Sequence, residues 1–171
     1  MGKHLGQEGG YRQFTTREML ALEAKLLAAI ERLAEKPGPL LTLDPKLPAQ
    51  INAEQVAAVE HITRKDGMVK VVTGMAGTGK TTMLRTAAEA WIQEKISVIG
   101  AAIAGKAARG LEAGSGIKSF TIAKLLMDLE KPGPLPPPRV LVIDEAGMVG
   151  TRQMLRVVDH CETKDIKLVL V

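Results

Sequence analysis

The segment VKVVTGMAGTGKTT, at residues 69–82, contains the side chains best suited to bind a phosphorylated ligand. From Gly74 to Thr81 it fits the pattern G-x-x-x-x-G-K-[ST] at every fixed position. Glycines in such a loop let the backbone N–H groups turn inward around an anion. The pattern therefore predicts a phosphate loop. Its predicted phosphate contacts are Gly74, Gly77, Thr78, Gly79, Lys80, Thr81 and Thr82.

Two side chains of this loop carry the predicted chemistry. Lys80 is placed to reach the β- and γ-phosphates and is a predicted catalytic residue, whereas Thr81 would place its hydroxyl on Mg²⁺. A helical pattern, MLRTAAEAWIQE, follows, and the positive N-terminal end of that helix favours the same negative charge. The alternative is a Gly-rich turn between a strand and a helix that binds no ligand.

A pair of carboxylates forms the second chemical feature. Asp144 and Glu145 follow directly after a predicted strand at 139–143. A carboxylate at the end of a strand beside a phosphate loop can hold the hydration shell of Mg²⁺, which is the role predicted for Asp144. Its neighbour Glu145 would take a proton from the attacking water. The alternative is an acidic turn without a ligand.

Gln55 has two interpretations. Asn52 and Gln55 form an N-cap and N3 pair at the start of a predicted helix that ends near His61, so Gln55 can close a capping box. An exposed amide just ahead of the phosphate loop can instead pair with the edge of adenine. The residues alone favour the capping box.

A basic segment follows the second predicted strand, at 96–102. Gly105, Lys106 and Arg109 lie near the start of the next predicted helix, where open parallel sheets bind their ligands. The alternative is a solvated basic face of that helix. A short helix is then expected from Ser119, with Phe120 pointing inward.

The remaining elements are one helix and several connectors. Residues 1–12 lack periodicity and are predicted to be flexible. A capping box formed by Thr15 and Glu18 opens an amphipathic helix at about 16–36, which Pro37 ends. The expected organisation is a flexible start, an N-terminal helix and connector at 13–48, and a phosphate-loop domain at 49–171. Further predicted elements are a Pro-rich spacer at 131–138, a helix at 148–161 and a last strand at 167–171.

Length and composition further limit the possible domain organisation and function of the chain. A chain of 171 residues is about one domain long, and its excess of four positive charges permits contact with a polyanion without demanding it. The single cysteine, Cys161, excludes an internal disulfide. No apolar run is long enough to span a bilayer, so no membrane segment and a cytoplasmic location are expected. With one Trp, one Tyr and two Phe, residues that stack on bases are sparse.

Five segments together resemble a known family. In order and spacing, INAEQVAAV, TGMAGTGKTT, GAAIAGKAARGLE, SFTIAKLL and VLVIDEAGMV resemble the first motor domain of superfamily I DNA helicases of the RecD-like group. With FTTREMLALE ahead of them, they are most similar to the helicase part of conjugative transfer relaxases of the TraA type. The resemblance covers about residues 11–171. It implies a three-layer α/β/α P-loop NTPase (RecA-like) domain with a parallel sheet, preceded by a helix, that binds ATP and Mg²⁺.

The resemblance also implies roles for single residues. Gln55 matches the glutamine that reads adenine, which reverses the preference for the capping box. Residues 104–109 and 119–121 match segments that touch single-stranded DNA, whereas Ala123 departs from a histidine often found in RecD proteins. The implied DNA contacts are Gly105, Lys106, Arg109, Ser119 and Thr121.

Parts of such helicases are missing from this sequence. Neither a G-D-x-x-Q element nor a second motor domain follows the last strand, and Tyr11 and His4 do not form the site of a relaxase nuclease. In phosphate-loop folds the strand at 167–171 would lie inside the sheet, so the domain is expected to be C-terminally truncated. We expect ATP binding, slow hydrolysis and no unwinding by this chain alone, with weak or absent binding of single-stranded DNA. The missing motor domain and proteins of the conjugation machinery are the expected partners.

Two other function classes are alternatives to the helicase. One is a nucleotide-binding fragment that is catalytically inert and serves in protein interactions. The other is a small P-loop NTPase or kinase unrelated to DNA. A kinase needs an acceptor-binding lid and a GTPase needs an N-K-x-D segment, and the sequence contains neither.

Overall fold

A computed structural model describes residues 3–8, 11–38, 47–49, 51–63, 66–74, 79–129 and 139–171, with side chains from Thr15 onward. The Pro-rich spacer predicted at 131–138 lies outside the described residues, as does most of the connector predicted at 40–48. Within the described part, no helix combines the length and the apolar character needed to cross a bilayer.

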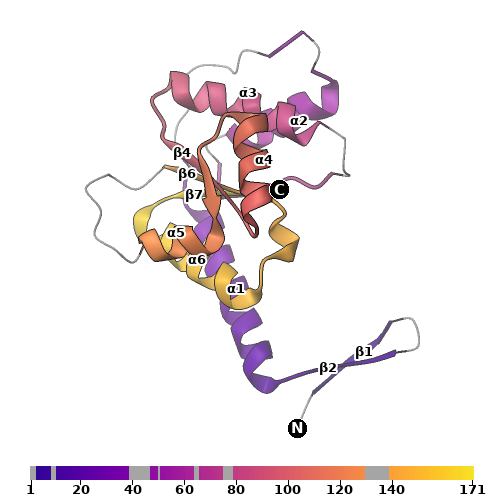
Figure 1. The fold of residues 1–171 in the computed structure, drawn as a ribbon. Coiled ribbons are helices and arrows are strands. Elements are labelled where there is room, and N and C mark those ends of the chain that lie inside the picture. The colour runs from indigo at the N-terminus through magenta and orange to yellow at the C-terminus, as the bar shows by residue number, and fades with distance from the viewer. Residues whose placement is uncertain are drawn as a thin grey trace.

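A five-stranded parallel sheet forms the centre of the molecule (Figure 1). Its spatial order is β3-β7-β6-β4-β5, so the last strand of the chain lies between β3 and β6, as predicted. The strands are β3 (Val69–Val71), β4 (Val98–Ala102), β5 (Ser119–Thr121), β6 (Val140–Ile143) and β7 (Lys167–Leu170). Strands buried on both faces read as continuous apolar runs, which explains the VLVI sequence of β6.

Helices cover both faces of the sheet. On one face, Val59 of α2 (Ala53–Thr63), Trp91 of α3 (Lys80–Gln93) and Leu111 of α4 (Gly105–Ser115) pack in one cluster with Val142 of β6. The other face is covered by α1 (Arg17–Glu35), α5 (Ile122–Leu129) and α6 (Thr151–Lys164). The predicted three-layer α/β/α fold with a parallel sheet is therefore confirmed.

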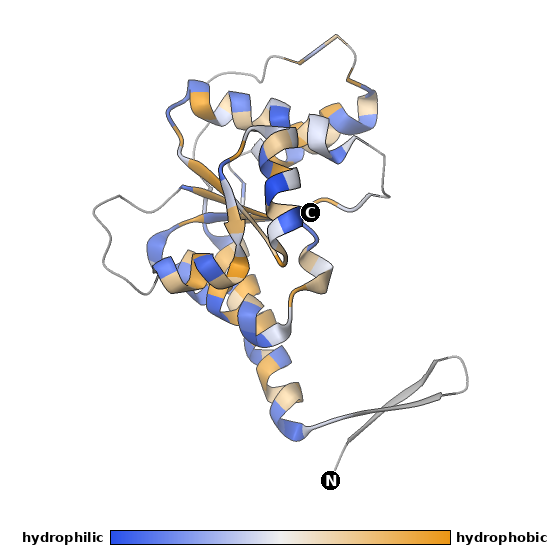
Figure 2. Cartoon of the chain, viewed as in Figure 1, coloured by the Kyte–Doolittle hydropathy of each residue, from blue (hydrophilic) through white to orange (hydrophobic). Residues whose placement is uncertain are grey.

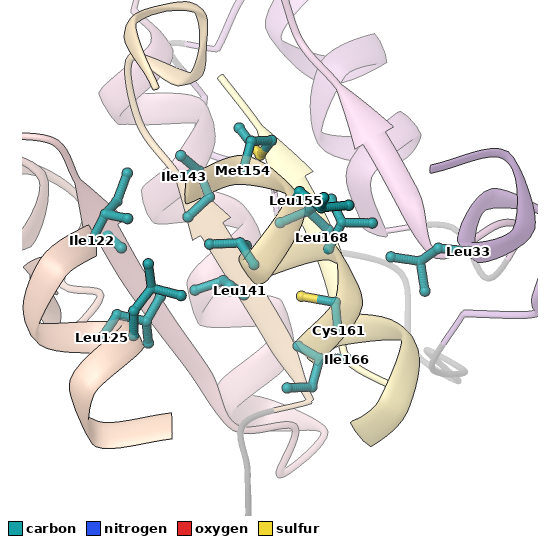
Figure 3. Close-up of a cluster of buried hydrophobic side chains, with 14 of the residues drawn as sticks. Leu33, Ile122, Leu125, Leu141, Ile143, Met154, Leu155, Cys161, Ile166 and Leu168 are labelled. Atoms are coloured by element: carbon teal, nitrogen blue, oxygen red, sulfur yellow. The ribbon is translucent and has the colours of Figure 1, made fainter. Parts of the chain in front are cut away.

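The second apolar cluster joins the N-terminal helix to the sheet. Leu33 of α1 and Leu125 of α5 lie around Leu141 and Ile143 of β6, with Cys161 of α6 beside them (Figure 3). Burial raises the pKa of the Cys161 thiol to about 12. Figure 2 shows that hydrophobic residues predominate along the strands, whereas the outer helices carry both hydrophobic and hydrophilic residues.

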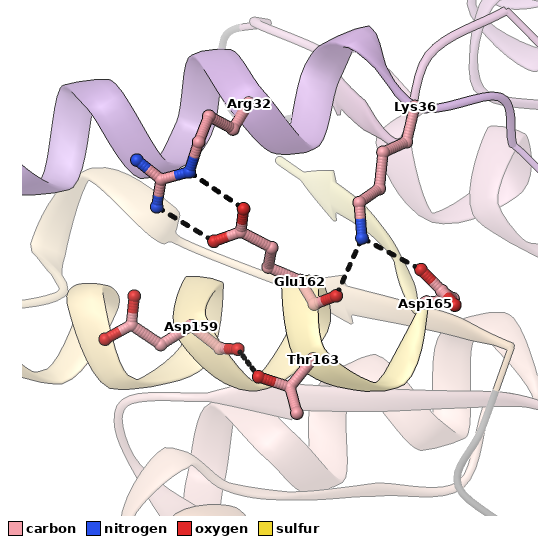
Figure 4. A network of polar contacts seen from close by, with 6 residues as sticks. All are labelled: Arg32, Lys36, Asp159, Glu162, Thr163 and Asp165. Atoms are coloured by element: carbon pink, nitrogen blue, oxygen red, sulfur yellow. Dashed lines mark hydrogen bonds and ion pairs between the residues drawn. The ribbon is translucent and has the colours of Figure 1, made fainter.

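α1 is also held by polar contacts on α6. Arg32 donates two hydrogen bonds of 2.9 Å to the carboxylate of Glu162, and the Lys36 ammonium donates to the Glu162 carbonyl and to Asp165 (Figure 4). The hydrogen bond from Arg32 lowers the pKa of the Glu162 carboxyl. Nearer its start, α1 is joined to α6 by an ion pair of 2.6 Å between Glu18 and Arg152.

The start of α1 differs from the prediction by one residue. Thr16, not Thr15, is the N-cap, and its hydroxyl accepts a 3.1 Å hydrogen bond from the Met19 N–H. Both threonines precede the same amphipathic run, so the sequence pattern alone could not choose between them. Because Glu18 pairs with Arg152 instead, the predicted capping box is wrong, although the predicted helix is confirmed.

The first residues of the chain form regular structure where none was predicted. β1 (Lys3–Glu8) and β2 (Tyr11–Thr15) pair antiparallel as a hairpin that projects from the start of α1 (Figure 1). A hairpin satisfies its backbone groups between two adjacent strands, so it needs no long hydrophobic periodicity to form. Aromatic Tyr11 and Phe14 also have high strand propensity.

Two predicted helices begin later than expected. The chain from Ser119 first forms β5, because it pairs with β4 before α5 begins, and Phe120 is half-buried instead of pointing fully inward. The helix predicted at 148–161 is preceded by a 3-10 turn at Ala146–Met148, and α6 starts only after Gly150.

Candidate functional site

The candidate site lies at the carboxyl edge of the sheet. Pairing between the strands places Val71, Leu170, Ile143, Ala101 and Phe120 in one row across it. The segments that follow these residues therefore leave the sheet side by side, which is where open parallel sheets bind ligands. The phosphate loop and the acidic pair leave β3 and β6, which are separated only by β7 and so lie about 10 Å apart.

Both ends of the phosphate loop are described, whereas residues 75–78, with the predicted contacts Gly77 and Thr78, lie outside the described residues. Gly79 is the N-cap of α3 in the left-handed conformation, with φ of 81°. Lys80 is the first residue of α3, and its ammonium donates a 2.8 Å hydrogen bond to the carbonyl of Gly74 across the mouth of the loop. Thr81 and Thr82 follow as exposed residues. The positive N-terminal end of α3 and the Lys80 ammonium therefore lie together at the mouth of the phosphate loop.

A hollow borders this spot. It is lined by Glu54, Gln55, Ala58, Val72, Thr73, Gly74, Gly79, Lys80 and Met83. A Cβ built on Gly79 would meet Nε2 at the flexible end of the Gln55 side chain, and the φ of 81° independently favours glycine at this position. The donors present, an ammonium group and the start of a helix, suit the phosphates of a nucleotide.

Gln55 forms the capping box that the residues alone predicted. Its backbone N–H donates to Oδ1 of Asn52 at 2.8 Å, and its Oε1 accepts from the Asn52 N–H at 3.1 Å. At the same time the side chain lines the hollow. The adenine contact implied by the resemblance stays a prediction.

The acidic pair is held by backbone hydrogen bonds. The Asp144 N–H donates to Ala101 on β4 at 2.9 Å, and the Ala146 N–H donates to the Val171 carbonyl at 3.0 Å. Between them, Glu145 has φ of 54°, a left-handed conformation that is uncommon for residues with a side chain. Glu145 is exposed and Asp144 is half-buried. The fold therefore directs Glu145 into solvent at the carboxyl edge.

A metal ion here would depend on more than carboxylates. Among the described residues, no group of three or more His, Cys, Asp or Glu side chains could hold one. Mg²⁺ commonly binds one or two carboxylates together with water and substrate phosphates. Asp144 and the hydroxyl of Thr81 fit such a mixed set.

The residues implied in DNA contact divide into two groups. Lys106 and Arg109 are exposed on the first turns of α4, and Gly105 is its first residue. In contrast, the Ser119 hydroxyl donates to the Ile117 carbonyl at 2.7 Å, and the Thr121 hydroxyl accepts from the Lys124 N–H at 3.2 Å. Both hydroxyls therefore stabilise the fold around β5, so their predicted contact with DNA gains no support here.

Phe120 is a surface residue that sequence reasoning missed. Its half-buried ring lies 5.7 Å from the ammonium of Lys118 and 5.5 Å from that of Lys124. Trp91, by contrast, is 1% exposed. The signal in the sequence was an aromatic residue flanked by lysines, which the prediction of an inward-facing helix concealed.

Comparison with known proteins adds three relatives and one family. A family model described as an AAA domain matches residues 50–171. The chain is 36% identical over 165 residues to a conjugal transfer protein TraA of Rhizobium radiobacter and 35% identical to one of Agrobacterium fabrum. It is 37% identical to a probable conjugal transfer protein TraA of Sinorhizobium fredii. Each alignment covers 93% of this chain but only 15% of the relative.

Proposed function

Because the chain belongs to the AAA domain family, we propose that it binds ATP with Mg²⁺ at the carboxyl edge of its sheet, as part of a DNA helicase motor acting in conjugative transfer. The proposal is supported by the convergence of three features at one edge of the sheet. The ends of the phosphate loop, the hollow beside Gln55 and the acidic pair lie at one edge of the sheet although they come from separate segments.

The proposed roles follow from the chemistry of each group. Lys80 would exchange its hydrogen bond with the Gly74 carbonyl for one with a phosphate oxygen, which is a charge-assisted and therefore stronger acceptor. Thr81 and Asp144 would hold Mg²⁺, which neutralises charge on the phosphates. Glu145, exposed on its left-handed turn, would accept a proton from the attacking water.

Contact with single-stranded DNA is proposed for the exposed start of α4 and for Phe120 on the edge strand β5. Lys106 and Arg109 offer exposed positive charge, and Phe120 offers an aromatic face beside two lysines. Proteins that bind single strands combine a positive track for the backbone with aromatic rings on which bases stack. The names of the relatives support a role in conjugal transfer, and proteins of that machinery are the proposed partners.

Calorimetric titration with ATP and Mg²⁺ tests the nucleotide proposal. We expect wild-type protein to bind and Lys80→Ala to bind about 10- to 100-fold more weakly, because a hydrogen bond to a charged group contributes about 1.5–3 kcal/mol. Lys25→Ala, which removes an exposed lysine of α1, is the matched control and should bind like wild type. An absence of heat with wild type would favour an interaction fragment that binds no nucleotide, and a preference for GTP would favour a GTPase.

The DNA proposal has a separate readout. Fluorescence anisotropy with a labelled oligothymidine at low salt should show weaker binding for Phe120→Ala, since stacking contributes about 1–3 kcal/mol per base. Phe120→Trp preserves an aromatic face and should retain binding. Equal affinity of the alanine and tryptophan variants would argue against stacking on this residue.

A further inference from the structure

Helices α3 and α4 approach closely at a single glycine. A Cβ built on Gly114 of α4 would overlap the Cγ2 methyl of Thr81 on α3, while it would lie 3.5 Å from the Thr81 Cβ and 3.7 Å from its Oγ1. The Thr81 methyl therefore points at α4 and occupies the space that a side chain at position 114 would need.

A second contact at the same residue keeps the helices together. The guanidinium of Arg85, one turn along α3 from Thr81, donates from Nε and Nη2 to the Gly114 carbonyl at 2.9 and 2.6 Å. Moving α4 away from α3 would break these hydrogen bonds. The close approach at Gly114 is thus built into the packing of the two helices.

We propose that Gly114 is a positioning residue for the metal site, because its missing side chain lets Thr81 keep the rotamer that turns the methyl, and not the hydroxyl, toward α4. This inference rests on the proposed function, in which that hydroxyl holds Mg²⁺. β-branched side chains have few favourable χ1 rotamers in a helix, so the rotation that removed the methyl from Gly114 would also redirect the hydroxyl. A side chain at position 114 would therefore act on the metal through Thr81.

The test compares two glycines of the same helix. Gly114→Ala introduces the overlap with Thr81, whereas Gly110→Ala adds the same methyl group where nothing lies within 4 Å. The measurement is the affinity for a fluorescent ATP analogue, once with Mg²⁺ and once with EDTA. The ratio of the two affinities isolates the contribution of the metal from that of the phosphates.

We expect Gly114→Ala to reduce this ratio about 10- to 100-fold, the usual effect of disturbing a residue that orients a metal ligand. The affinity in EDTA should stay near that of wild type, and Gly110→Ala should keep the wild-type ratio. A ratio for Gly114→Ala equal to that for Gly110→Ala would overturn the inference.

A rescue variant separates positioning from simple damage to the fold. Thr81→Ser keeps the hydroxyl but lacks Cγ2, so Thr81→Ser combined with Gly114→Ala should recover the Mg²⁺ effect lost in Gly114→Ala. If Gly114→Ala fails to fold by circular dichroism, the double variant should fold and bind with an Mg²⁺ gain, and its failure to do so overturns the inference. A wild-type protein that gains nothing from Mg²⁺ would instead refute the proposed function, and this inference with it.

Discussion

Lys167 provides a test of how the sheet is buried beneath the site. Lys167 lies on β7 and is 0% exposed. It pairs with Val140 of β6 and lies on the same face of the sheet as Lys70 of β3. The pKa of its ammonium is lowered from 10.5 to about 8, mainly by burial and in smaller part by the positive charge of Lys70, while Asp66 opposes the change. A lysine here is therefore costly to keep charged at neutral pH.

The sign of the effect follows from proton binding. Between pH 8 and 10.5 the unfolded chain keeps a proton on Lys167 that the folded chain releases, so the contribution of Lys167 to the free energy of unfolding rises with pH across this window. At 1.36 kcal/mol for each unit of pKa, the difference corresponds to about 3 kcal/mol. Lys167→Met removes the charge while keeping a long apolar side chain. We expect this variant to be more stable than wild type by up to about 3 kcal/mol below pH 8, and the gain to fade toward pH 10.5.

Urea denaturation at several pH values within this window measures the effect. The matched control is Lys25→Met, which makes the same change at an exposed position of α1 and should leave the pH dependence of stability as in wild type. If Lys167→Met and wild type showed parallel pH profiles, Lys167 would be hydrated in solution, and its burial within the fold would be refuted.

Three further outcomes are expected. Leu33→Ala, at a fully buried contact of α1, should lower the free energy of unfolding by about 2–5 kcal/mol, whereas Leu27→Ala, at a residue 61% exposed, should change it by less than about 0.5 kcal/mol. Equal effects in urea melts would show that α1 is not packed on the sheet. The Cys161 thiol should react with a disulfide reagent only upon unfolding, since burial raises its pKa to about 12, and rapid reaction of folded protein would contradict its burial. Glu145→Gln should keep calorimetric ATP binding and lose phosphate release, and unaltered release would exclude Glu145 as the base.

The fold was predictable where a local pattern determines it. β6 is buried on both faces of the sheet, so all of its residues are apolar. The phosphate-loop pattern implied both a parallel sheet and a place for β7 inside it. Local signals failed where pairing in space decides the structure. The chain from Ser119 has a helical composition, yet its first residues pair with β4 and become a strand. The sequence pattern predicts a capping role for Glu18, because its partner in the structure, Arg152, is too far away in the sequence to be recognised from it.

The site shows the same division. Short-range patterns identified Lys80, Asp144 and Glu145, because their chemistry depends on neighbours in sequence. The contact of Gly114 with Thr81 joins two helices that are separated by a strand, so no spacing in the sequence indicates it. Phe120 was likewise recognisable only after its strand, and not a helix, was known to lie at the edge of the sheet.

The two interpretations of Gln55 make opposite predictions about one amide. In this structure Oε1 of Gln55 accepts from the Asn52 N–H. The base-reading interpretation proposes that the amide turns away from this cap to pair with adenine, which presents one donor and one acceptor, so that the hydrogen bond to Asn52 opens. ATP should then accelerate hydrogen exchange at the Asn52 N–H, although binding usually slows exchange elsewhere. Inorganic triphosphate, which fills the phosphate loop but has no base, is the control and should leave the capping box closed. Equal protection of the Asn52 N–H with both ligands would show that the cap stays closed when ATP is bound, and would refute the interpretation in which the Gln55 amide leaves the cap to read the base.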